Sequence, residues 1–144
     1  MFRQLTDRVS ASPQIGLAEV AEAARQGFAL IVNNRPEDES PDQTPGHEIE
    51  AAARAAGLAY VAIPVTHAGF SEPQVQAMAG ALAGAGEGRV LAYCRSGTRS
   101  TLLWSLAEAS RGADPDELAS RAASAGYDLS PIRALIDMLA ARAG

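Results

Sequence analysis

The chain has 144 residues, 47% of them apolar and 20% charged, with a formal net charge of −5. This length allows one core in a single domain spanning 1–144, and an acidic chain without a long basic tract is not expected to bind nucleic acid. No apolar run reaches the ~18 residues of a membrane span, and the opening MFRQLTDRVSAS lacks the apolar core of a secretory signal, so we expect a cytoplasmic protein without membrane partners.

In chain order, short apolar runs alternate with longer amphipathic segments. The first half predicts a strand at 9–12, a helix at 17–26, a strand at 28–34, a helix at 47–57 and a strand at 58–65. Gly27 and Gly57 follow the two helices, as is typical of helix ends. The stretch 35–46 is polar and contains prolines, which indicates either an ordered site loop or a flexible insertion.

The second half predicts one more strand and four helices. A helix begins at Ser71, where Ser-Glu-Pro-Gln resembles a capping box. A strand at 89–93 follows, and then helices at 99–110, 114–125 and 131–142. Asp114-Pro115 and Ser130-Pro131 supply the helix start signals.

This alternation predicts an α/β fold with a mainly parallel central sheet of four or five strands, flanked by helices on both faces. In such sheets, ligands bind beyond the carboxyl ends of the strands. The stretch YCRSGTRS, residues 93–100, lies at the end of the predicted strand 89–93 and directly before a helix. It also contains the only cysteine of the chain, Cys94.

A loop between a strand and a helix can direct successive N–H groups inward and form an anion site that the helix dipole reinforces. Those amides, with Arg95 and Arg99, are expected to favour the thiolate of Cys94 and lower its pKa below the usual value of about 8.5. Gly97 permits a tight turn. The remaining candidates for substrate binding are the hydroxyl side chains Ser96, Thr98 and Ser100, and Ser100 is also a candidate hydrogen-bond donor to the thiolate.

The alternative interpretation makes Cys94 a small core residue, as most lone cysteines are. Two arginines close to it argue against this, because unpaired buried charges are destabilising. One cysteine cannot form an internal disulfide, and His47 and His67 are far apart, so neither a metal site nor another cofactor is expected. All twelve basic residues are arginine, so a fixed anion site must use arginine or backbone N–H groups.

The residues CRSGTRS resemble the active-site loop of rhodanese sulfurtransferases. The chain as a whole is similar to another family, the small bacterial phosphatase-like domain of beta-lactamase-hydrolase-like proteins. The stretches that carry this resemblance are SASPQI, GFALIVNNRPEDES, AAGLAYVAIPV and the cysteine loop. The resemblance implies a cysteine-phosphatase-like fold, a catalytic role for Cys94 and a functional link to a metallo-beta-lactamase-type sulfur enzyme.

The spacing favours sulfur transfer over phosphate hydrolysis. Four residues separate Cys94 from Arg99, whereas tyrosine and dual-specificity phosphatases have five, and a shorter loop suits a single persulfide sulfur. Phosphatases of this kind also take an acid from the loop after the preceding strand, but residues 65–72 contain no aspartate. Four residues are weak substitutes for that acid: His67, Glu72, Asp38 and Asp42.

The leading prediction is a sulfurtransferase that takes sulfur from thiosulfate or a persulfide as a Cys94 persulfide and passes it to a thiol acceptor. Arg99, as a catalytic residue, and Arg95, as a substrate-binding residue, are expected to orient the donor anion and compensate the developing charge. The first alternative is a dual-specificity-type phosphatase acting on a phosphorylated substrate through a Cys94 phosphoenzyme, and the second is a non-catalytic anion-binding or redox-sensing module. Arg35 and His67 are candidates for the rim of the site. The acidic residues 37–39 are interpreted as a solvated loop, and Trp104 as core.

Overall fold

The computed structural model describes residues 2–143. Its five strands are β1 (Arg3–Gln4), β2 (Val9–Ser12), β3 (Phe28–Asn33), β4 (Ala59–Ala62) and β5 (Arg89–Tyr93). They form one sheet in the order β1-β2-β5-β3-β4, in which only β1 is antiparallel to its neighbour. The predicted mainly parallel α/β fold is therefore confirmed.

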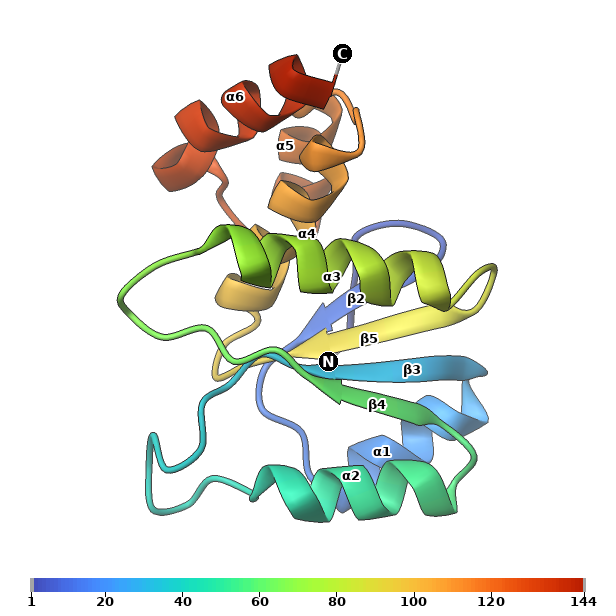
Figure 1. Ribbon diagram of the computed structural model, residues 1–144. Coiled ribbons are helices and arrows are strands. Elements are labelled where there is room, and N and C mark those ends of the chain that lie inside the picture. The colour runs from blue at the N-terminus through green and yellow to red at the C-terminus, as the bar shows by residue number, and fades with distance from the viewer. Residues whose placement is uncertain (1, 144) are drawn as a thin grey trace.

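Helices cover both faces of the sheet, as Figure 1 shows. The helices α1 (Leu17–Arg25) and α2 (Gly46–Ala55) lie against one face. The other face carries α3 (Glu72–Gly84) and α4 (Thr98–Ser110), and α4 in turn supports α5 (Pro115–Ser124) and α6 (Arg133–Ala143), which follows a short 3-10 turn, Ser130–Ile132. Within residues 2–143, no helix combines the length and the apolar character needed to cross a bilayer.

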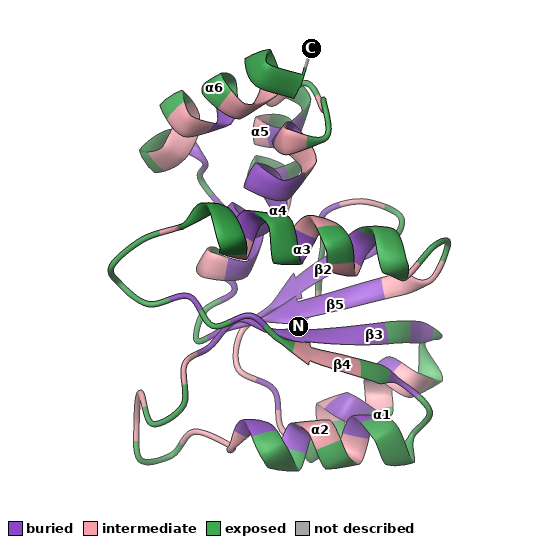
Figure 2. Ribbon diagram, viewed as in Figure 1, coloured by how far each residue is buried: buried purple, intermediate pink, exposed green. Residues whose placement is uncertain are grey.

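The central strands are apolar on both faces because helices cover both. In β3, Leu30 and Val32 face the α3 and α4 side, whereas Ile31 between them faces α1 and α2. Figure 2 shows β2, β3 and β5 largely buried and the edge strand β4 only partly so. The helix α4 is buried almost all round, and Trp104 is fully enclosed, as predicted.

The elements differ most from the predictions in three places. The predicted strand 58–65 is regular only over Ala59–Ala62, although Ile63 and Val65 still donate backbone hydrogen bonds to Asn33 and Asn34. The predicted helix 131–142 begins with a 3-10 turn. The two-residue strand β1 was not predicted, because so short a segment has no periodicity to detect.

The helix start signals at Ser71 and Asp114 are confirmed, whereas the one at Ser130 is wrong: the Ser130 hydroxyl donates to Asp128 Oδ2 and caps no helix. Ser71 and Gln74 exchange the two hydrogen bonds of a capping box: Ser71 N–H donates to the Gln74 side chain at 2.8 Å, and Gln74 N–H donates to Ser71 Oγ at 3.4 Å. Asp114 caps α5 by accepting from Asp116 N–H. These local contacts determine where α3 and α5 begin.

Candidate active site

The cysteine loop, residues 94–100, follows the central strand β5 directly and leads into α4. Cys94 N–H donates to Ser12 O at 3.3 Å, and Gln14 N–H donates to Arg95 O at 3.3 Å, so the loop after β2 holds its first residues. Gly97 caps α4 with a φ of +91°, a left-handed conformation that favours glycine. The predicted position beyond the carboxyl ends of parallel strands is the one observed.

The sulfur of Cys94 is buried and accepts a hydrogen bond. Gly97 N–H donates to Cys94 Sγ at 3.1 Å. This peptide dipole, at the N-terminus of a helix, is directed at the sulfur and stabilises negative charge there. Cys94 therefore lies at the bottom of a polar loop, not in a purely aliphatic core.

The guanidinium of Arg99 is held by two partners. Its Nη1 donates to Glu39 Oε2 at 2.7 Å and to Val65 O at 2.8 Å, and its Nη2 donates to Glu39 Oε1 at 2.9 Å. These bonds use three of the five N–H groups of an arginine and leave Nε–H and one Nη2–H for another acceptor. The hydrogen bonds that Arg99 donates to Glu39, and then the charge of Cys94, raise the pKa of Arg99.

Glu39 is the acidic partner of two arginines. Its hydrogen bonds from Arg99 and then from Arg35 lower its pKa to about 2. Only 16% of its side chain is exposed. The prediction of a solvated acidic loop is therefore wrong for Glu39, which turns inward because Arg99 and Arg35 offer it charge-assisted hydrogen bonds, and right for Glu37 and Asp38, which are exposed.

Arg35 lies behind Glu39 and is 4% exposed. Its guanidinium donates to three acceptors: Glu39 Oε1 at 2.9 Å, Gln14 Oε1 at 3.0 Å and Ser40 Oγ at 3.1 Å. Arg35 therefore forms an ion pair with Glu39 and supports the loop 35–45. Arg35 lies beside the site because Glu39 binds both Arg35 and Arg99.

The other predicted substrate-binding residues divide into two groups. Ser100 is buried and its hydroxyl donates to Asn34 Oδ1 at 2.8 Å, so the prediction that it donates to the thiolate is wrong. Ser96 and Thr98 are exposed at the mouth, where Ser96 Oγ donates to Thr98 Oγ1 at 3.0 Å. Arg95 is exposed beside them.

His67 lies in the exposed turn between β4 and α3. Among the hydrogen bonds of residues 2–143, none joins it to the cysteine loop. Several residues that contact the loop or Arg99 were not predicted as site residues, among them Gln14, Glu39 and Tyr127. They reach the loop from distant parts of the chain, so no local motif could indicate them.

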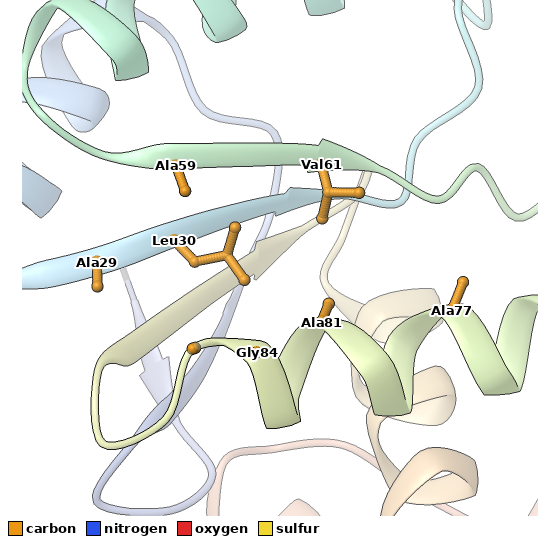
Figure 3. A pocket seen from close by; sticks show the side chains of 8 residues that line it. Ala29, Leu30, Ala59, Val61, Ala77, Ala81 and Gly84 are labelled. Carbon is orange, nitrogen blue, oxygen red and sulfur yellow. The ribbon is translucent and has the colours of Figure 1, made fainter.

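An apolar groove of about 460 Å³ lies elsewhere, between α3 and the first residues of β3 and β4. Figure 3 shows that small side chains line it, among them Ala29, Ala59, Ala77 and Ala81. The groove therefore offers no charged group to an anion. It lies at the opposite end of the strands from Cys94, so it is not part of the site.

Comparisons with known proteins agree with this fold. The family model of the phosphatase-like domain of beta-lactamase hydrolase-like proteins matches residues 1–111. A beta-lactamase hydrolase-like protein of Xylella fastidiosa is 40% identical over 127 residues, which are 87% of this chain but 29% of that protein. The chain thus spans less than a third of that curated relative.

Solved structures of similar fold include two described as putative phosphatases. The one from Neisseria meningitidis is 33% identical with a TM-score of 0.81, and the match covers 96% of this chain and 97% of that one. The one from Shewanella putrefaciens is 22% identical with a TM-score of 0.78, over 99% and 93% of the two chains, and shows the fold alone. These findings support the phosphatase alternative better than the sulfurtransferase prediction.

Proposed function

Because the chain belongs to the phosphatase-like domain family of beta-lactamase hydrolase-like proteins, we propose that it is a cysteine-dependent phosphatase acting on phosphate monoesters. One observation carries the proposal. A buried sulfur that accepts the Gly97 N–H lies near an arginine whose charge acts on it and whose orientation Glu39 fixes. A thiolate nucleophile and an oriented guanidinium are the two parts that phosphoryl transfer to sulfur requires.

In the proposed reaction, the Cys94 thiolate attacks phosphorus and the bond from phosphorus to the ester oxygen breaks. The leaving oxygen takes a proton from water and departs as an alcohol or phenol. Water then attacks the phosphocysteine, the P–S bond breaks and the thiolate is regenerated with inorganic phosphate as product. Arg99 donates its remaining Nε–H and Nη2–H to two phosphoryl oxygens, which neutralises charge in both steps.

Glu39 cannot serve as the general acid of this reaction. Its pKa of about 2 keeps it ionised at neutral pH, and the loop 65–72 supplies no aspartate. The site is therefore suited to esters whose leaving group needs little protonation, such as aryl phosphates. Alkyl phosphates should be much poorer substrates.

Sulfur transfer is a second candidate, favoured by the four-residue spacing between Cys94 and Arg99. In this reaction the thiolate attacks the outer sulfur of thiosulfate, the S–S bond breaks and sulfite leaves. A nucleophilic thiol then takes the sulfur from the Cys94 persulfide and releases the thiolate. Sulfite leaves without a proton, so the missing acid is no obstacle.

Two assays on the same preparations separate the candidates. Release of phenol from an aryl phosphate, abolished in Cys94→Ser, supports the phosphatase. Intact-mass measurement after thiosulfate treatment, with one sulfur added to the wild type and none to Cys94→Ser, supports the sulfurtransferase. Absence of both would leave a non-catalytic anion-binding or redox module and contradict the proposal.

A further inference from the structure

The peptide group between Ser96 and Gly97 is hydrogen-bonded at both ends. Its N–H belongs to Gly97 and donates to Cys94 Sγ at 3.1 Å. Its carbonyl belongs to Ser96 and accepts from Tyr127 Oη at 3.1 Å. Because the C=O and N–H of a trans peptide point in opposite directions, fixing the carbonyl also fixes the direction of the N–H.

We propose that Tyr127 is a positioning residue of the active site, which holds the peptide of residues 96–97 so that its N–H is directed at the Cys94 sulfur. This inference deepens the proposed function and rests on Cys94 acting as a thiolate. A donor on the carbonyl also polarises the peptide and strengthens its N–H as a donor. Tyr127 thus acts on the nucleophile without touching it.

Tyr127 is itself held rigidly. It is 8% exposed, and its backbone N–H donates to Ala122 O at 2.8 Å. The guanidinium of Arg3 lies 5.3 Å from the centroid of its ring and donates to Ala125 O at 3.1 Å. The phenol therefore has a fixed position at the start of the turn that leads to α6.

The contact between Tyr127 and the loop also requires a glycine at position 97. A Cβ placed on Gly97 would collide with the Tyr127 hydroxyl, so glycine is required here for space as well as for its positive φ. Burial raises the pKa of Tyr127, and the nearby Arg3 opposes that shift. The hydroxyl therefore remains a protonated donor at neutral pH.

Tyr127 lies outside the residues 1–111 that the family model matches. The carboxyl-terminal segment is thus more than a cover for α4, because it supplies one hydrogen bond to the cysteine loop. The role of Tyr127 is detectable without knowing the substrate, since it concerns the thiolate.

The test compares Tyr127→Phe with Tyr60→Phe, which removes a half-buried hydroxyl that accepts from Asn33 and does not contact the cysteine loop. Alkylation of Cys94 by iodoacetamide is measured against pH in the folded proteins. Tyr127→Phe should slow alkylation at neutral pH about fivefold and move the midpoint of the profile upward, as expected for one lost hydrogen bond. Tyr60→Phe should reproduce the wild type.

The amide proton resonance of Gly97 is the second readout. It should shift in Tyr127→Phe and not in Tyr60→Phe. If the alkylation profile of folded Tyr127→Phe superimposes on that of the wild type, the inference is overturned. This outcome differs from failure of the proposed function, in which the wild type itself would alkylate with the profile of a free thiol.

Discussion

At the scale of single residues, the site depends on Arg99 being both charged and oriented. Glu39 and Val65 O bind one edge of its guanidinium, so the opposite edge has a defined direction. Lysine could supply the charge but not the paired, planar N–H donors of a guanidinium, because an ammonium is a point donor on a flexible side chain. The charge of Arg99 and the planar shape of its guanidinium therefore contribute separately to the site.

Arg99→Lys should therefore lower turnover by about 100-fold or more, as expected when an oriented transition-state donor is lost. The matched control is Arg54→Lys, at an exposed arginine of α2 paired with Glu50. Steady-state kinetics on an aryl phosphate, or on thiosulfate if that is the substrate, checks this. Equal activity of the two variants would remove Arg99 from the mechanism.

Glu39 gives a pH dependence with a definite sign. Its pKa is about 2 in the folded state and 4.5 in the reference state, so folding favours the ionised form. Its contribution to stability is complete above about pH 4.5 and is lost as the pH falls toward 2. The wild type should therefore unfold more easily across this interval.

Glu39→Gln should be less stable than the wild type at neutral pH, because both arginines lose their charged partner. Its stability should also fall less than that of the wild type as the pH drops below 4.5. Thermal midpoints at several pH values measure both effects, with Glu48→Gln at an exposed position of α2 as the control. A Glu39→Gln decline parallel to that of the wild type would contradict the assigned pKa.

At the scale of elements, the junction between β5 and α4 depends on Gly97. Its φ is +91°, and the Tyr127 hydroxyl fills the space that a Cβ at this position would need. Both requirements exclude a side chain, and they are independent of each other. The turn therefore couples strand, helix and carboxyl-terminal segment at one residue.

Gly97→Ala should destabilise the protein by more than about 1 kcal/mol, whereas Gly80→Ala should stabilise it by about 0.5–1 kcal/mol. Gly80 lies inside α3 with open space around its Cα, so alanine there gains helix propensity without a clash. Urea unfolding of the two variants measures the difference. Similar effects at both positions would contradict the proposed constraint on Gly97.

At the scale of the whole molecule, α5 and α6 extend the core of the α4 side. Leu118, Ala122 and Ile136 are buried in the same cluster as Leu103 and Trp104. Helix α4 would lose this cover if the chain ended where the family match ends. The carboxyl-terminal third is thus part of one core, which fits its contact with the cysteine loop.

A fragment of residues 1–111 should consequently fail to unfold cooperatively, because it exposes the apolar surface of α4 that α5 and α6 cover. Circular dichroism during heating, with gel filtration to detect aggregation, checks this expectation. A sharp, reversible transition of the fragment near that of the full chain would show that the two helices are dispensable.

The sequence by itself determined the features that arise from neighbouring residues. Apolar periodicity predicted the parallel sheet with helices on both faces, and Ser71 and Asp114 marked helix starts because capping acts over two or three residues. The placement of Cys94 and Arg99 at the junction of a strand and a helix followed from the same signals. The resemblance predicted the family, which the comparisons confirm.

Only the tertiary structure decided which distant groups complete the site. Glu39 is 60 residues from Arg99, and Tyr127 is 31 residues from Ser96. Their contacts depend on the order of strands in the sheet and on how α5 and α6 pack on α4, and nothing in the local sequence encodes that order. Glu37, Asp38 and Glu39 are chemically alike in sequence, yet only Glu39 meets two arginines, because the loop geometry turns that one inward.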